Sequence, residues 1–281
     1  MRHLELFAGI GGFRRAMDLL TQDHIMDFHC IGYSEIDVKA VKTYCANYHP
    51  EVDGELAMGD IVEFTSNKDN IDNLPQFDLV TGGFPCQTFS MMGKQAGFNE
   101  DRGQMFFHII DILAAKMPRY VLLENVKNLK SHDKGRTFAR IKQELEALGY
   151  QVFTDIFNTA QFHLPQTRNR LLIFATTEPV PADFEVQFTC DNIAVLFDQV
   201  YQDLGTYHYQ SVNDILSLEV DKKYFLSEKI KPTLLADGSA NFKSKSDINM
   251  SIARPLTATM HKMHRACQDN YYSQDFIESH G

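Results

Sequence analysis

Residues 82–86, Gly-Gly-Phe-Pro-Cys, place Cys86 directly after a proline where the apolar run 77–81 ends. The run predicts a buried strand, and the glycines and proline predict a tight loop at its carboxyl end. Ligands and reacting groups in open α/β sheets gather at that edge. A free thiol has a pKa of about 8.5, so it needs a nearby cation, helix N-terminus or base to act as a nucleophile. Cys86 is therefore a candidate nucleophile, and a small buried hydrophobic residue is the alternative.

Two more polar clusters stand at the ends of predicted strands. Glu124-Asn125-Val126 ends the fifth strand, and the segment 166–170, Gln-Thr-Arg-Asn-Arg, opens the seventh. Both should reach the edge that carries Cys86. A shielded carboxyl group can hold or donate a proton, and arginines beside it can orient it or bind an oxygen that gains negative charge. These residue types make Glu124, Arg168 and Arg170 candidate catalytic residues, with a structural ion pair as the alternative.

A glycine turn follows the first predicted strand and opens a helix, with Gly9 and Gly11 in the turn. Amides at the N-terminus of such a helix can face the polar end of a bound ligand. Arg14 stands where the dinucleotide fingerprint needs a third glycine or alanine. Glu35 after the second strand and Asp60 after the third could accept hydrogen bonds from ribose and adenine, although N-capping is the alternative for each acid. Together these features indicate a cofactor that contains adenosine.

The elements that position these groups alternate up to about Thr177, where short apolar runs are separated by helical patterns. This order predicts an α/β fold with a doubly wound, mostly parallel, seven-stranded sheet. The predicted strands are 2–7, 29–34, 55–59, 77–81, 119–123, 151–157 and 170–176. The predicted helices are 12–20, 38–48, 104–117 and 134–148. After residues 178–181 turn residues multiply, which predicts a catalytic and cofactor-binding domain at 1–177 and a small irregular region at 178–281.

The composition is that of a globular protein with reduced thiols. The chain of 281 residues is 44% hydrophobic and 23% charged, and no apolar run approaches the roughly 18 residues of a membrane span. It also shows no signal-peptide pattern, so we expect a cytoplasmic protein without a membrane partner. Five cysteines without a Cys-x-x-Cys pair argue against a disulfide framework. His261, His264 and Cys267 lack a fourth ligand, and we expect no metal.

The net charge of -10 has the wrong sign for a protein that coats nucleic acid indiscriminately. The charge is unevenly distributed, because five basic residues stand against the single acid Asp247 between Lys243 and Arg265. A local patch of this kind can contact phosphates. Lys262 and Arg265 are therefore candidate DNA contacts, and a solvated loop with chance charge is the alternative.

These blocks, in this order and spacing, resemble the cytosine carbon-5 DNA methyltransferases. The matching blocks are Phe7-Ala-Gly-Ile-Gly-Gly12, Glu35, Asp60-Ile61, Pro85-Cys86-Gln87, Asp101-Arg102-Gly103, Glu124-Asn125-Val126 and Gln166-x-Arg168-x-Arg170. The resemblance covers the first 177 residues and places the target-recognition region after them. It implies the methyltransferase fold that uses S-adenosylmethionine, with double-stranded DNA as the substrate.

The family's roles carry over to the matching positions. The resemblance implies that Cys86 adds to carbon-6 of a flipped cytosine, which turns carbon-5 into a nucleophile toward the methyl group, and that Glu124 assists at ring nitrogen 3. Arg168 and Arg170 would orient that carboxylate and contact the base. On the substrate side the resemblance implies Gln87, Ser90 and Asn125, the last of which also holds the Glu124 loop. The implied cofactor contacts are Phe7, Gly9, Gly11, Glu35, Ile36, Asp60, Ile61 and Pro85.

Two features depart from the family pattern. The chain lacks the Arg-x-Leu-Thr-x-Arg-Glu-like block and the helix containing Gly-Asn-Ser that usually follow the recognition region, and it stops at Gly281. A second polypeptide that supplies these blocks, or a truncated and inactive product, would each account for this. His163 stands where many relatives have glycine.

The sequence therefore predicts a DNA (cytosine-5-)-methyltransferase, or its catalytic subunit, in a bacterial restriction-modification system. A relative acting on transfer RNA would use the same residues, but a recognition region of roughly a hundred residues favours DNA, because reading base edges in a groove needs dedicated surface. The third possibility is a non-catalytic module that binds the cofactor or DNA and regulates a partner. The presence of Cys86, Glu124, Arg168 and Arg170 together argues against it.

Overall fold

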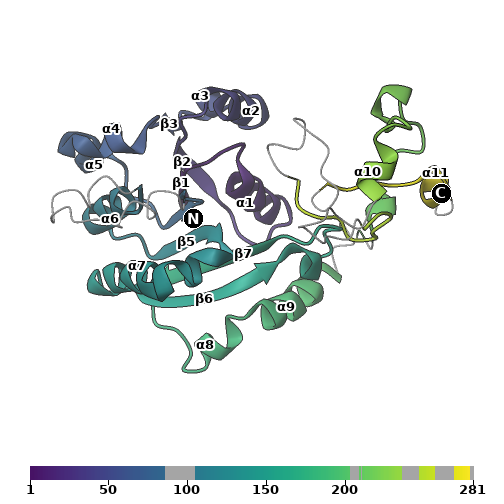
Figure 1. Cartoon of the computed structure of the whole chain (residues 1–281). Helices are drawn as coiled ribbons and strands as arrows, with labels where there is room; N and C mark the ends of the chain where they lie inside the picture. The colour runs from purple at the N-terminus through teal and green to yellow at the C-terminus, as the bar shows by residue number, and fades with distance from the viewer. Residues whose placement is uncertain (86–104, 203–208, 210, 236–246, 257–268, 279–281) are drawn as a thin grey trace. The chain divides into compact units, whose positions relative to one another are not determined.

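The computed structural model describes residues 1–85, 105–202, 209, 211–235, 247–256 and 269–278 (Figure 1). Five predicted site residues lie outside the described residues, namely Cys86, Gln87, Ser90, Lys262 and Arg265. The chain divides into two compact units, one of 1–156 with 170–189 and one of 157–169 with 190–281. The functional division between a catalytic domain at 1–177 and a recognition region at 178–281 stays a prediction.

One seven-stranded sheet organises the first unit, with the strand order β3-β2-β1-β4-β5-β7-β6. The strands are β1 (Arg2–Leu6), β2 (His29–Ser34), β3 (Leu56–Ala57), β4 (Leu79–Gly82), β5 (Tyr120–Val126), β6 (Gln151–Asn158) and β7 (Asn169–Thr176). Neighbours from β3 to β5 pair in parallel, and β7 pairs antiparallel to β5. The predicted mostly parallel α/β sheet is confirmed. The largest difference is at β5, which extends to Val126 and includes Glu124 and Asn125.

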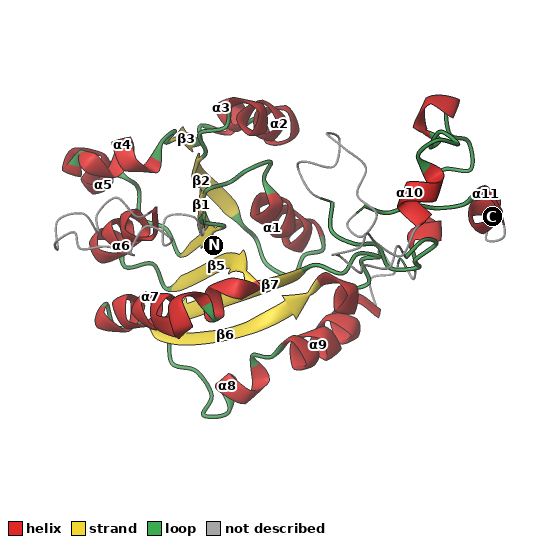
Figure 2. Cartoon of the chain, viewed as in Figure 1, coloured by secondary structure: helices red, strands yellow, loops and turns green. Residues whose placement is uncertain are grey.

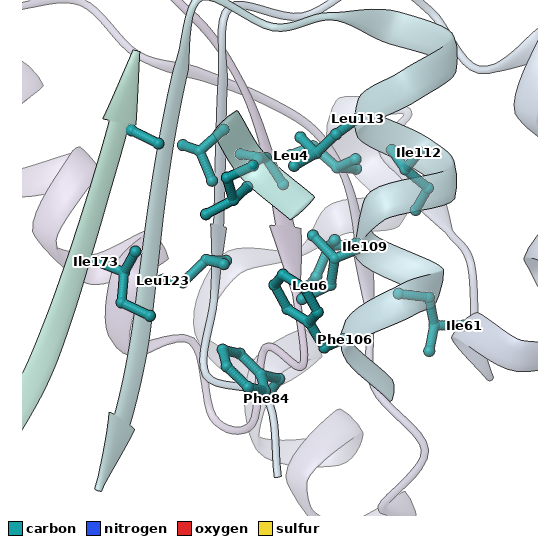
Figure 3. Packing of buried hydrophobic residues seen from close by; sticks show 14 of the residues in the cluster. Leu4, Leu6, Ile61, Phe84, Phe106, Ile109, Ile112, Leu113, Leu123 and Ile173 are labelled. Atoms are coloured by element: carbon teal, nitrogen blue, oxygen red, sulfur yellow. The ribbon is translucent and has the colours of Figure 1, made fainter. Parts of the chain in front are cut away.

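The sheet's apolar core forms because alternate strand residues point to the same face. In β1, Leu4 and Leu6 are 0% exposed and belong to the main core cluster. Helix α6 (Met105–Lys116) supplies Phe106 and Ile109 to the same cluster, and Figure 3 shows these side chains directed toward the strands. Burying one such side chain stabilises the fold by about 1.5–3 kcal/mol. This packing fixes the strands whose carboxyl ends carry the candidate site.

The helices of the first unit only partly follow the sequence pattern. They are α1 (Gly12–Gln22), α2 (Val38–Tyr48), α3 (Pro50–Asp53), α4 (Ile61–Ser66), α5 (Lys68–Asn73), α6, α7 (Arg136–Ala147) and α8 (Phe184–Gln187). The predicted start of α7 at Lys134 is wrong. Asp133 and Lys134 have φ values of 50° and 57°, and Gly135 has 85°, so these residues form a left-handed turn ahead of the helix. The short helices α3, α4 and α5 were not predicted.

The opposite face of β1 is polar, although it is equally buried. His3 and Glu5 are 0% exposed. His3 Nε2 lies 2.7 Å from Thr81 Oγ1, and Glu5 accepts the Arg14 amide at 3.3 Å. Burial lowers the pKa of His3 to about 3 and raises the pKa of Glu5 to about 7. His3 is therefore neutral at physiological pH, and Glu5 titrates close to it.

In the part of the second unit that the structure describes, loops connect one helix of 13 residues, α9 (Cys190–Gln202), and several short ones (Figure 2). Its helices are η5 (Thr159–Phe162), α9, η6 (Val212–Asp214), η7 (Lys222–Tyr224), α10 (Lys231–Leu235) and α11 (Gln274–Glu278). His163 ends η5 with a φ of 55°, the left-handed region that glycine adopts without strain, and its Nε2 lies 2.6 Å from Asp198 Oδ1. Among the described residues, no helix has the length and apolar character to cross a membrane.

We predict that Glu5→Gln changes how stability depends on pH. Because the pKa of Glu5 is raised from 4.5 to about 7 by burial, the unfolded chain releases its proton first as pH rises. As pH rises from 4.5 to 7, the free energy of unfolding of the wild type should therefore fall by up to about 3 kcal/mol relative to that of the Glu5→Gln variant. Urea unfolding at a series of pH values measures this difference. The exposed Glu63→Gln is the control, and a Glu5→Gln difference that does not vary with pH would contradict the prediction.

Candidate active site

The chain is anchored immediately before Cys86. Phe84 is 3% exposed, and its ring packs against Phe106 with 5.6 Å between centroids (Figure 3). The Phe84 carbonyl accepts a hydrogen bond of 2.8 Å from Nδ2 of Asn125, which is 1% exposed. Pro85 follows with an exposed side chain. Asn125, predicted on the substrate side, is therefore a buried group that positions the segment leading to Cys86.

Glu124 and Arg170 form an ion pair at the carboxyl end of β5. Arg170 Nε lies 2.5 Å from Glu124 Oε1, and the side chains are 24% and 26% exposed. The antiparallel register pairs Val126 with Arg170, which brings the start of β7 to this edge. A Cβ on Gly83 would lie 3.4 Å from Glu124 Oε2, so the second carboxylate oxygen lies beside the chain three residues before Cys86. The structure thus brings together two of the predicted catalytic residues.

Arg168 belongs to the second unit. Its backbone amide donates to Thr159 Oγ1 at 3.1 Å, and its carbonyl accepts the Thr159 amide at 3.1 Å. Thr167 next to it donates to the Ala253 carbonyl at 2.8 Å. These bonds fix the backbone of the predicted Gln166-x-Arg168-x-Arg170 block within its unit. A role of the Arg168 side chain at Glu124 stays a prediction.

The glycine turn is held by the carboxylate that the sequence placed after β2. Gly9 and Gly11 have φ values of 57° and 88°, which glycine adopts without strain. Glu35 Oε2 accepts the Gly9 amide at 2.8 Å, and Oε1 accepts the amides of Ile36 and Asp37, each at 2.8 Å. Two carboxylate oxygens offer about four lone-pair sites, so Glu35 retains acceptor capacity for a ligand.

The sequence predicts that the first amides of α1 face a ligand, but one of them binds a buried side chain instead. The Arg14 amide donates to the buried carboxylate of Glu5 at 3.3 Å. A carboxylate at a helix N-terminus satisfies amides that have no partner within the helix. The sequence analysis did not assign this role to Glu5. The available signal was a charged residue between the apolar Leu4 and Leu6 in a predicted strand.

The other predicted cofactor residues differ in their exposure and in their contacts. Ile36 is 69% exposed beside Glu35, whereas Ile61 is 2% exposed and packs in the core (Figure 3). The Ile61 side chain is part of the core, and a cofactor contact of this residue stays a prediction. Asp60 Oδ1 accepts the Val62 amide at 2.8 Å, which confirms the N-cap reading of that residue. Phe7, at the start of the turn, has a φ of 53°, which is strained for a residue other than glycine.

This arrangement fits an adenosine group. A Cβ on Gly9 or Gly12 would meet no atom within 4 Å, so open space lies in front of the turn. The carboxylates of Glu35 and Asp60 are acceptors suited to ribose hydroxyls and an amino group, and exposed Ile36 offers an apolar surface to a ring.

A basic turn, Lys127–Lys134, follows the Glu124 motif and was missed as a candidate. It comprises η3 (Lys127–Lys130) and most of η4 (His132–Gly135). Lys127, Lys130 and Lys134 are exposed, and none is in an ion pair among the residues that the structure describes. The signal was present in the sequence, because three lysines occur within eight residues of a chain whose net charge is -10.

Comparison with known proteins decides the family. The model of the C-5 cytosine-specific DNA methylases matches residues 1–280. The chain belongs to this family. Among curated family members, it is 38% identical over 227 residues to the type II methyltransferase M.NlaX of Neisseria lactamica, covering 81% of this chain and 63% of that protein. It is 34% identical over 242 residues to the orphan methyltransferase M.Rho11sI of Bacillus phage rho11s, covering 82% and 46%. The chain thus spans about half the length of the curated relatives it matches.

Solved structures of methyltransferases share the fold. The S. pombe Dnmt2 methyltransferase aligns with a TM-score of 0.67 at 19% identity, covering 96% of this chain and 74% of that one. The Entamoeba histolytica methyltransferase EhMeth aligns equally well, with a TM-score of 0.67 at 19% identity and the same coverage of 96% and 74%. These likenesses confirm the predicted methyltransferase fold class.

We predict that Asn125→Ala lowers the free energy of unfolding by about 1–3 kcal/mol, because the buried hydrogen bond from Asn125 to the Phe84 carbonyl is lost. Asn47→Ala is a matched control, since Asn47 Nδ2 also donates to a backbone carbonyl, that of Thr43 at 2.9 Å, but at an exposed position. The control should change stability by less than about 0.5 kcal/mol. Urea denaturation measures both. Equal losses in the two variants would show that Asn125 does not anchor this segment.

Proposed function

We propose that this protein transfers a methyl group from S-adenosylmethionine to carbon-5 of cytosine in DNA. The observation that carries the proposal is the Glu124 carboxylate, which Arg170 holds at 2.5 Å beside the chain leading to Cys86. Membership of the C-5 cytosine-specific DNA methylase family supports the substrate class. The names of relatives such as M.NlaX, a type II methyltransferase, support a role in restriction and modification.

S-adenosylmethionine would supply an electrophilic methyl group on its sulfonium. Glu35 and Asp60 would accept hydrogen bonds from its adenosine, and Ile36 would cover the adenine ring. Phe7, Gly9 and Gly11 would shape the turn in front of which the cofactor lies, and Pro85 would border it next to Cys86. Because the Ile61 side chain is in the core, its backbone would make such a contact.

Cys86 would act as the nucleophile. Its thiolate would form a bond to carbon-6 of a cytosine that has left the duplex stack, and the electron pair of the 5,6 double bond would become available at carbon-5. Carbon-5 would then form a carbon-carbon bond to the methyl group as the sulfur–methyl bond breaks, and its electron pair would stay on the sulfur as a neutral thioether. Loss of the carbon-5 proton to a base then restores the double bond and expels the thiolate.

Glu124 would lower the barrier to that addition. The ring accepts electron density more readily when nitrogen 3 is protonated or hydrogen-bonded. Arg170 binds Oε1, so Oε2, which lies toward Gly83, is the oxygen we assign to nitrogen 3. Asn125 would act one step away, by holding the Phe84 carbonyl ahead of Cys86.

The first test is transfer of a labelled methyl group from S-adenosylmethionine to unmethylated DNA. We expect label in 5-methylcytosine with the wild type and none with Cys86→Ala. The control is Cys190→Ser, which keeps a hydroxyl to donate to Gln161 Oε1, the side-chain oxygen that accepts from Cys190 Sγ at 2.6 Å. If transfer RNA is labelled in a parallel reaction and DNA is not, the DNA assignment is wrong. Label that appears only after coexpression with the neighbouring open reading frame would show that a second polypeptide is required.

The covalent step has its own test. A DNA duplex with 5-fluorocytosine at the target position has no carbon-5 proton to lose, so the bond to Cys86 should persist after methyl transfer. We expect a complex that survives denaturing electrophoresis with the wild type and is absent with Cys86→Ala. Methylation of ordinary DNA without any trapped complex would contradict the covalent mechanism.

The basic turn Lys127–Lys134 would contact DNA phosphates beside the flipped base. Each phosphate contact contributes a slope of about 0.9 to the dependence of log affinity on log salt. We predict that Lys127→Ala with Lys130→Ala lowers this slope by about 2, as measured by fluorescence anisotropy. Arg2→Ala with Lys116→Ala is the control, because it removes the same charge near the amino ends of β1 and β5. Equal changes in both double variants would exclude a local contact.

A further inference from the structure

The hydroxyl of Tyr48 contacts the glycine turn from the side of α2. It donates to the Gly11 carbonyl at 2.8 Å. The ring lies so close that a Cβ on Gly11 would be 2.2 Å from Tyr48 Cε2. Glycine is needed at position 11 for two reasons, the φ of 88° and the close approach of an aromatic ring.

The Tyr48 ring is itself fixed by its neighbours. Tyr44, which is 0% exposed, lies 4.9 Å from Tyr48 and 4.3 Å from Tyr33 of β2, between ring centroids. On another side, the Arg14 guanidinium lies 5.5 Å from the centroid of the Tyr48 ring. Arg14 is held in turn by ion pairs with Asp18, at 2.9 Å, and with Glu55. A hydroxyl on a ring held in this way has little freedom to move.

Helix α2 connects this contact with the other contact on the turn. Its N-cap, Asp37, follows Glu35 and Ile36, and its last residue is Tyr48. Glu35 binds the Gly9 amide, and Tyr48 binds the Gly11 carbonyl. The two ends of a single helix thus hold a donor and an acceptor of the same turn.

We propose that Tyr48 is a positioning residue for the cofactor turn, and that its hydroxyl increases cofactor affinity without touching the cofactor. The inference rests on the proposed use of S-adenosylmethionine. Loss of one hydrogen bond to the turn corresponds to a change of about threefold to tenfold in affinity if the bound geometry requires it. The Gly11 carbonyl also accepts the Arg15 amide at 2.9 Å, so the fold survives the loss of the hydroxyl.

Tyr48→Phe removes only the hydroxyl, and the chain offers a matched control. Tyr150 is 3% exposed, and its hydroxyl donates to the Pro118 carbonyl at 2.8 Å, the same distance as in the Tyr48 contact. We expect Tyr48→Phe to raise the dissociation constant for S-adenosylmethionine about threefold to tenfold and Tyr150→Phe to leave it unchanged. Isothermal titration calorimetry of the whole chain without DNA measures binding, and a thermal melt of each variant measures stability.

Kinetics separate positioning from a general structural effect. Tyr48→Phe should raise KM for S-adenosylmethionine and leave kcat at saturating cofactor unchanged, because the reacting groups are intact. An unchanged dissociation constant, an equal rise in Tyr150→Phe, or a fall in kcat alone would overturn the inference. If the wild type binds the cofactor and Tyr48→Phe behaves like it, only the positioning role fails. Wild-type protein that binds no S-adenosylmethionine would instead overturn the proposed cofactor, and the positioning role with it.

Discussion

Antiparallel pairing of β7 with β5 is the constraint on which the Glu124 site depends. Parallel strands bring only their carboxyl ends to the functional edge of a sheet, so a residue that begins a strand reaches that edge only where one strand is reversed. The register of Val126 with Arg170 makes the ion pair possible. That register is enforced by the core, because Leu171 and Ile173 of β7 are 0% exposed. A slip of one residue would turn both out of the main core to the face where Phe174 packs against Phe153, and would turn Arg170 to the opposite face.

In the proposed cofactor site, Glu35 and Asp60 would combine two roles that the sequence presented as alternatives, binding backbone amides and binding a ligand. Asp60 is an N-cap, and Glu35 accepts three backbone amides, at Gly9, Ile36 and Asp37. Such bonds hold a carboxylate in one orientation before a ligand arrives. Binding then requires less ordering of the side chain, which is the usual source of affinity in a preorganised site. Capping and ligand binding are therefore compatible uses of one residue type.

The sequence predicted the strands well because apolar runs and their ends are local signals. It missed α4 and α5, which are six residues each and too short to show helical periodicity. It placed Ile61 at the cofactor by family position, whereas the side chain packs in the core. The contact of Tyr48 with Gly11 joins residues 37 positions apart, so no local pattern indicates it. Side-chain partners of this kind depend on how the elements pack, and only the structure supplies them.

Burying the polar face of β1 costs stability, and the contacts that this face makes with α1 explain why it is tolerated. Burying the Arg14 and Glu55 side chains, which are 11% and 1% exposed, carries a desolvation penalty that their attraction need not recover. Replacing a buried ion pair by apolar residues of similar volume is often neutral or stabilising. A polar face, however, ties α1 to the segment before β3 and gives the Arg14 amide a carboxylate partner in Glu5. Directional bonds fix position where apolar contacts permit sliding. Glu5 binds the first turn of α1, which follows the glycine turn directly, so these bonds would help to position the turn for the proposed cofactor.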